Sequence, residues 1–238
     1  MGLYDRDYVR DNARNRDIGY AQEAHVEHSD LSAFISKTYQ LFAASLIAGA
    51  AGGYIGVGVA DFVAANYWFI AIPWMLFGMF GINMVIHKPG INYIALFVFT
   101  LVSGIIICPL LNRFLGMSNG PELIANAFIS TSVIFGALSI YAMNSKSDFS
   151  SWGKPLMIAF FIVIVASLIN VFFLHSPMMH VVILGIFMLI ISAMVLYDTQ
   201  NIINGAYSSP IEGALALFLD FFNMFVTLLQ IFGIMGDD

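Results

Sequence analysis

Charged residues are scarce in this sequence, and their scarcity excludes an ordinary soluble protein. Asp, Glu, Lys and Arg make up 10% of the 238 residues, whereas a soluble domain carries roughly a quarter. Eleven of these charges fall within residues 1–30, so the rest of the chain carries very few. Hydrophobic residues account for 60% of the sequence. This composition is typical of a polytopic membrane protein.

Cysteine and basic residues are also too few for several other classes of protein. The single cysteine, Cys108, lies inside an apolar run, which excludes a disulfide scaffold. The net charge of −6 offers no basic surface for a phosphate backbone, so we expect no nucleic-acid partner. Residues 1–30 lack the apolar stretch of a signal peptide. We expect them to form a polar cytoplasmic tail ahead of a transmembrane domain at residues 31–238.

Apolar segments of membrane-spanning length follow the tail, separated by charges and by Pro and Gly clusters. Crossing the hydrocarbon core takes about 20 apolar residues, and the backbone must satisfy its own hydrogen bonds there, which favours helices. We therefore predict an all-α membrane protein with seven transmembrane helices in the lipid bilayer. The predicted spans are 33–58, 66–87, 91–112, 122–143, 155–174, 177–204 and 210–233. A re-entrant last segment would leave six spans instead.

Basic residues are distributed unevenly between the two predicted sides of the membrane. With the N-terminus inside, eight basic residues lie on the cytoplasmic side, and Arg113 alone lies outside. The positive-inside rule therefore predicts a cytoplasmic N-terminus. The first span also carries Gly49, Gly52, Gly53 and Gly56, which allow another backbone to approach closely. We expect these glycines to serve packing within the chain, with a homodimer face as the alternative.

Two aspartates, Asp198 and Asp220, lie inside the last two predicted spans. Gly205 is suited to end the sixth helix, and Ser209-Pro210-Ile211-Glu212 resembles a capping box that starts the seventh. Counted from these ends, Asp198 lies about 9 Å deep and Asp220 about 15 Å deep on antiparallel neighbours. Lys and Arg are absent from the middle of every predicted span. The two carboxyl groups are therefore expected to come close together without a basic partner.

Further polar residues share helix faces with these aspartates. Asn201 follows Asp198 on one helix, and on the other Asn223, Thr227 and Gln230 follow Asp220 at steps of three, four and three. One interpretation is hydrogen bonding between helices. That interpretation is weaker for two aspartates, because a charge at mid-membrane costs about 2.5 kcal/mol or more. The pair is instead expected to share a proton, to hold a weakly bound Ca²⁺ ion, or to line a water-filled cavity.

At these residues the sequence resembles the transmembrane Bax inhibitor motif family, in particular its bacterial YccA-like branch. The resemblance covers about residues 33–236. It is carried mainly by Tyr197–Ile203, Ala214–Phe225 and Leu228–Gly233, with weaker contributions from Lys37–Tyr39 and His87–Gly90.

The resemblance implies a fold and a function. The fold has seven helices with the last one central, in the bacterial cytoplasmic membrane. The function that the resemblance implies is a pH-sensitive Ca²⁺ leak, for which the matching aspartates are Asp198 and Asp220. Similar channels are thought to use a basic latch from the second span, where this chain offers only Asn83, His87 and Lys88 at the inner end.

Two functions from different classes follow from these observations. The first is a cation leak, with Ca²⁺ as the conducted ion and no bound cofactor. The alternative is a regulatory protein that modulates a membrane-bound AAA protease or a stress response, as some family members do. An enzyme is not expected, because Asp220 lacks the Gly-x-Gly-Asp context of intramembrane aspartyl proteases.

Overall fold

The chain folds into a bundle of helices. A computed structural model describes the backbone of residues 4–236, and the side chains from Asp30 to Met235 apart from Met79 and Asn83. The α-helices are α1 (Tyr4–Val57), α2 (Ala60–Ala65), α3 (Tyr67–Leu76), α4 (Ile82–Val85), α5 (Ile91–Ile106), α6 (Cys108–Leu115), α7 (Gly120–Asn144), α8 (Gly153–Ile169), α9 (Pro177–Ile203) and α10 (Pro210–Gly236).

Six helices in the described part of the chain are long and apolar enough to cross a membrane. They are Asp30–Val57, Ile91–Leu115, Gly120–Asn144, Ser150–Leu174, Pro177–Ile203 and Pro210–Met235. Their ends lie within a few residues of six predicted spans, so these six are confirmed as long apolar helices. Each begins or ends near the charges and the Pro and Gly clusters used to predict it.

The remaining predicted span, 66–87, is helical but irregular. It consists of α3, the π-helical turn Phe77–Gly81 and α4, which follow one another without a break from Tyr67 to Val85. Pro73 lies inside α3. A proline interrupts the hydrogen-bond ladder of a helix, and π turns are irregularities of the same kind. The sequence pattern therefore predicted the extent of this segment but not its irregular winding.

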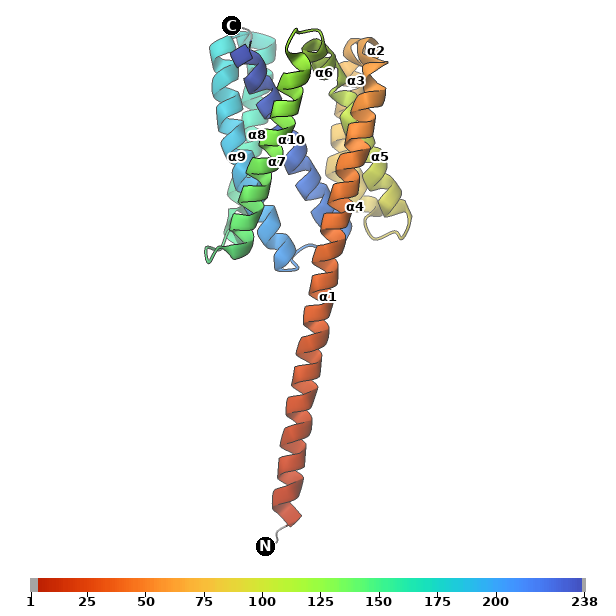
Figure 1. Ribbon diagram of the computed structural model, residues 1–238, viewed down its shortest axis with the longest axis vertical. Coiled ribbons are helices and arrows are strands. Elements are labelled where there is room, and N and C mark those ends of the chain that lie inside the picture. Colours follow the sequence, from red (N-terminus) through yellow and green to blue (C-terminus); the bar gives the residue numbers. More distant parts are fainter. Residues whose placement is uncertain (1–3, 237–238) are drawn as a thin grey trace.

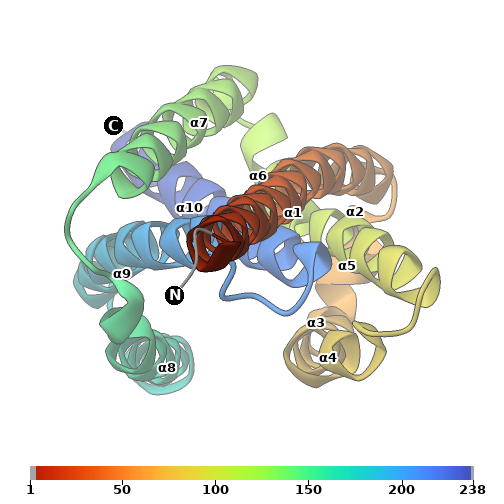
Figure 2. The same ribbon diagram turned by 90° about the horizontal axis from the view of Figure 1, so that it is seen from below.

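The last helix, α10, joins the two halves of the bundle. On one side α1 packs against α5, and on the other α7 and α8 pack against α9. Helix α10 contacts α1, α5, α7 and α9. The view along the bundle shows α10 running between these two groups (Figure 2). Its residues also form much of the buried core, including Leu217, Phe218, Met224 and Leu229.

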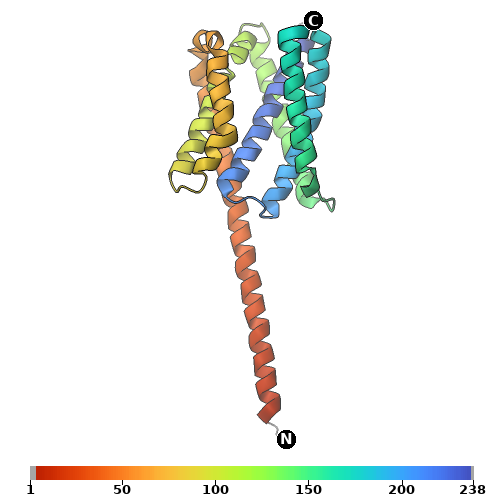
Figure 3. The same ribbon diagram turned by 180° about the vertical axis from the view of Figure 1, so that it is seen from behind.

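Helix α1 enters the bundle at one end, and helix α10 finishes at the opposite end (Figure 1). The turns between α4 and α5, between α7 and α8 and between α9 and α10 all lie at the end from which α1 projects toward the N-terminus (Figure 3). We call this the inner end. Side chains of the predicted tail, residues 1–30, lie outside the described residues except for Asp30.

Glycines bring α1 and α5 into close contact. A Cβ atom built on Gly52 would overlap the carbonyl group of Leu101, and one built on Gly104 would overlap the carbonyl of Gly49. A Cβ on Gly56 would crowd the Cys108 side chain. Small residues of this kind allow two backbones to approach closely in a membrane. The prediction that these glycines serve packing within the chain is confirmed.

Substitution of Gly104 by Ala is expected to destabilise the bundle. The added methyl group would force α1 and α5 apart, and such overpacking typically costs about 1–3 kcal/mol. Gly136→Ala in α7 is the matched control, because a Cβ there meets no atom within 4 Å. Thermal unfolding in detergent should show a lower midpoint for Gly104→Ala only. Equal midpoints for the two variants would contradict this account of the α1–α5 contact.

Candidate functional site

The turn between α9 and α10 determines how the two aspartate-bearing helices meet. Gly205 adopts a left-handed conformation with φ of 64°, as predicted, and the backbone N–H of Ala206 donates to the carbonyl of Asn201 at 2.8 Å. Helix α10 begins at Pro210, and the Ser209 hydroxyl accepts a hydrogen bond from the N–H of Ile211. Glu212 reaches back to the N–H of Ser208, one residue earlier than a standard capping box requires.

Asp198 and Asp220 lie side by side at the end of this hairpin and are almost completely buried. Their exposed fractions are 6% and 2%, and the two carboxyl groups are close enough to influence each other directly. Ionised carboxylates only accept hydrogen bonds, so a direct hydrogen bond within this pair would need a proton on one of the two groups. The second oxygen of Asp220, Oδ2, is buried without a hydrogen-bond partner among the described residues.

Tyr207, in the turn itself, completes this cluster. Its hydroxyl donates a hydrogen bond to Asp198 Oδ1 at 2.6 Å. Burial, together with the Asp198 carboxyl group beside it, raises the pKa of Tyr207 above its ordinary value. The phenol therefore remains a protonated donor, which stabilises negative charge on Asp198.

The inner end of α9 is enclosed by protein on all sides. Asp198, Thr199, Gln200 and Asn201 are consecutive polar residues, and all four are buried. Thr199 donates to Ser139 of α7 at 3.3 Å. The Gln200 side chain accepts from the N–H of Phe149 and donates to the carbonyl of Ser147, both in the segment between α7 and α8. Consecutive helical residues point in different directions, so this polar run contacts several neighbours at once.

Aromatic rings pack against one another beside the aspartate pair. Phe221, the residue after Asp220, lies with its ring centroid 5.6 Å from that of Phe135 and 6.1 Å from that of Phe42. Phe42 and Phe135 stack at 5.3 Å. All three side chains are buried. They form a buried aromatic cluster that joins α1, α7 and α10.

The remaining polar residues predicted on the face of α10 have different surroundings. Thr227 donates to the carbonyl of Asn223, and Gln230 donates to the carbonyl of Val226, so these hydrogen bonds stay within α10. Thr227 and Gln230 also line a cavity of about 190 Å³, together with Ser167 of α8 and His180 of α9. They therefore lie next to open space between helices, whereas Asp220 lies beside Asp198.

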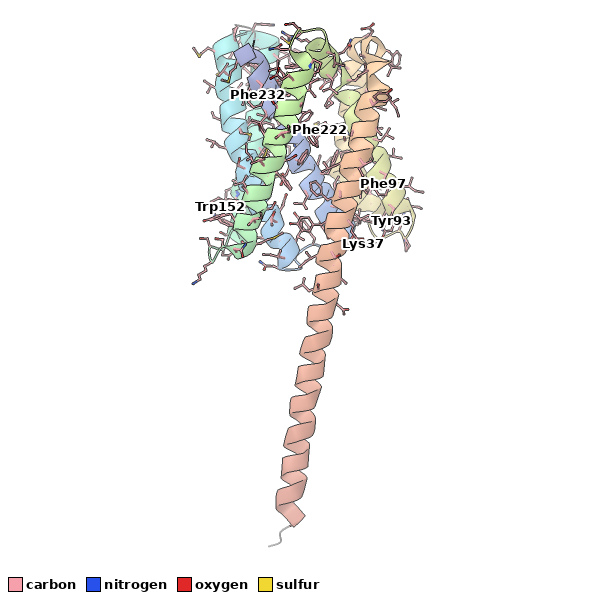
Figure 4. All side chains as sticks on the ribbon, in the orientation of Figure 1. Lys37, Tyr93, Phe97, Trp152, Phe222 and Phe232 are labelled. Atoms are coloured by element: carbon pink, nitrogen blue, oxygen red, sulfur yellow. The ribbon has the colours of Figure 1, made fainter. Side chains whose placement is uncertain are left out.

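The candidate latch residues lie at the inner end of the bundle. His87 and Lys88 are exposed in the turn after α4, and the side chain of Asn83 lies outside the described residues. Lys37 lies over the ring of Tyr93, with Nζ 5.7 Å from its centroid (Figure 4). Among the side chains that the structure describes, no basic group forms an ion pair with either aspartate. A latch made by these residues stays a prediction.

A metal ion at the aspartate pair would need ligands from elsewhere. The described residues contain no group of three or more His, Cys, Asp or Glu side chains suited to a metal. Ca²⁺ takes six to eight oxygen ligands. Two carboxyl groups would therefore have to be supplemented by water and backbone carbonyl oxygens, and such a site binds weakly.

Together these features define a multi-pass helical membrane protein whose last two helices bury an aspartate pair. The sequence profile of the family described as "Inhibitor of apoptosis-promoting Bax1" matches residues 31–237. The chain belongs to this family, the Bax inhibitor family.

Three relatives illustrate the range of the family. An uncharacterised Campylobacter jejuni protein, Cj0236c, is 41% identical over 237 residues, which cover 97% of each chain. The Escherichia coli K12 protein named "Modulator of FtsH protease YccA" is 33% identical over 68% of this chain and 75% of its own length. Bax inhibitor 1 of Schizosaccharomyces pombe is 31% identical over 87% of this chain and 78% of its own length.

Proposed function

We propose that this protein is a pH-sensitive Ca²⁺ leak of the bacterial cytoplasmic membrane, with Asp198 and Asp220 as its gate. The observation that carries the proposal is the burial of both carboxyl groups in contact with each other, without a basic partner among the described side chains. A buried charge costs several kcal/mol, and hydrogen-bonding glue between helices needs no carboxylate. Such a pair is suited to exchange protons and to attract a cation.

The proposed topology has seven crossings, with the α3–α4 segment as the second and α10 at the centre. The contacts of α10 with both halves of the bundle support its central position. An odd number of crossings fits the arrangement in which α1 enters the bundle at one end and α10 finishes at the opposite end (Figure 1). In this topology the inner end is cytoplasmic and residues 1–30 form a cytoplasmic tail. Lys88, Lys146 and Lys154 then lie on the cytoplasmic side, in agreement with the positive-inside rule.

The gate closes when the two carboxyl groups share one proton. In that state the pair carries a single negative charge, and its burial in the bundle keeps bulk water away from it. As pH rises, the shared proton is lost and two adjacent negative charges repel each other. Their separation opens the hairpin and offers a weak site to a divalent cation, which suits passage. Asn201, Asn223, Thr227 and Gln230 would supply further oxygen atoms along the path.

Replacing either aspartate by asparagine is expected to abolish the pH dependence of Ca²⁺ flux. In liposomes the wild-type flux should rise between pH 5 and pH 8. Both Asp198→Asn and Asp220→Asn should lower flux at pH 8 by about tenfold or more, because each variant removes the repulsion between two carboxylates that opens the gate. Asp148→Asn, at an exposed position between α7 and α8, is the matched control. If the wild type and all three variants show the same Ca²⁺ flux at every pH, the aspartate pair takes no part in the mechanism.

Tyr207→Phe is expected to shift the pH profile of the flux upward. Loss of the hydroxyl removes a hydrogen bond to the Asp198 carboxylate, and bonds to charged groups contribute about 1.5–3 kcal/mol. The pair would then hold its proton more tightly, so half-maximal flux should move up by about one to two pH units. Tyr141→Phe, at an exposed tyrosine, should leave the profile unchanged. A downward shift for Tyr207→Phe would contradict the proposed role of its hydroxyl.

A second candidate function is the modulation of a membrane-bound protease. It is favoured by the relative named as a modulator of FtsH protease. In this role the tail at residues 1–30 and the outer helix faces would contact the partner.

Affinity purification from bacterial membranes distinguishes the two candidates. If the protein modulates a protease, the full chain should recover a membrane-bound AAA protease, and a variant lacking residues 1–30 should recover much less. Equal recovery with both chains would count against the tail as the contact. If the truncated chain loses the protease but retains full Ca²⁺ flux, the two activities are separate.

A further inference from the structure

A large apolar groove lies on the opposite face of α10 from the cavity at Gln230. Its volume is about 420 Å³, within the range of sites that hold drug-sized ligands. Its walls come from α1 around Gly53 and Tyr54 and from α7 around Ala125 and Phe128. The floor is made by four rings of α10, those of Phe218, Phe221, Phe222 and Phe225.

The groove opens sideways between α1 and α7. Its rim residues Tyr54 and Phe128 are 86% and 48% exposed. Both belong to helices long and apolar enough to cross a membrane. Figure 4 shows the side chain of Phe222 in the space between the ribbons of α1 and α7. The opening therefore runs along these helices toward the end of the bundle opposite the inner end, where Tyr54 and Pro121 lie close to helix ends.

The lining of the groove is unsuited to water or ions. Tyr54 is its sole lining residue with a polar side-chain atom, and no lining side chain is charged. Cavities with apolar walls stay dry. Neighbouring side chains on the same two helices, such as Ile47, Ile129 and Val133, are exposed and apolar. The groove is thus continuous with the surface that these helices present to lipid, where the surrounding molecules are acyl chains.

We propose that this groove binds an acyl chain of a membrane phospholipid as a resident ligand. The chain would lie along α10 over the rings of Phe222 and Phe225 and fill the space between α1 and α7. Each of these two helices packs on α10, so the acyl chain would complete the contact between the two halves of the bundle. The proposal is independent of whether the protein conducts ions.

Photo-crosslinking in nanodiscs tests this binding site. The full chain is reconstituted with phosphatidylethanolamine and phosphatidylglycerol, of which a small fraction carries a diazirine in one acyl chain. After illumination, mass spectrometry should find phospholipid adducts on the floor residues Phe221, Phe222 and Phe225, in addition to surface adducts. Adducts confined to outward-facing residues such as Ile129 and Val133 would overturn the proposal.

Variants that fill the groove provide the second arm of the test. Ala50→Trp and Ala125→Trp place an indole in the groove and should reduce the floor adducts at least tenfold. Ala43→Trp and Ala137→Trp carry the same change at exposed positions of α1 and α7 outside the groove, and they should leave the floor adducts unchanged. Unchanged floor adducts in the groove-filling variants would overturn the proposal. Competitors added before illumination identify the ligand. If oleic acid prevents the floor adducts but excess unlabelled phospholipid does not, the ligand is a free fatty acid and the phospholipid assignment is wrong.

Discussion

The contact between two buried carboxyl groups is the constraint on which the inner end of this molecule depends. Asp198 and Asp220 are withdrawn from water and have no basic partner among the described side chains. Two negative charges in such surroundings would repel each other strongly. In the proposed account, a shared proton removes one charge, and the hydroxyl of Tyr207, which donates to Asp198, stabilises the other. The sharp turn at Gly205 positions that hydroxyl, because it directs the chain back toward the ends of both helices.

Several other features of the fold maintain this arrangement. Thr199 and Gln200 attach the inner end of α9 to α7 and to the segment that follows it. The rings of Phe42, Phe135 and Phe221 join α1, α7 and α10. Contact of α10 with both halves of the bundle means that a movement of its aspartate also changes its packing on α1 and α7. A change of protonation at the pair is therefore linked to the packing of the whole bundle.

The sequence predicted the elements of the fold better than it predicted their contacts. Helix ends were predictable because Pro, Gly and charged residues interrupt the apolar runs, as at Ser176-Pro177 and Ser209-Pro210. The two aspartates stood out because charges are rare in apolar helices.

Tyr207 could not be recognised, because a tyrosine in a turn is common and its partner depends on how the turn folds. The contacts of Gln200 and the apolar groove between α1 and α7 depend on which helices are neighbours. The periodicity of the sequence alone does not reveal this. The π turn at Phe77–Gly81 leaves no residue pattern that distinguishes it from a regular helix.

Infrared difference spectroscopy of the carboxyl groups tests the central claim most directly. If Asp198 and Asp220 share one proton, the wild-type protein at neutral pH should show a protonated carboxylic acid C=O band. That band should vanish on titration to high pH and should be missing from the Asp198→Asn, Asp220→Asn double variant. A wild-type spectrum at neutral pH without a protonated carboxyl band, or with a band that the double variant retains, would contradict the shared proton.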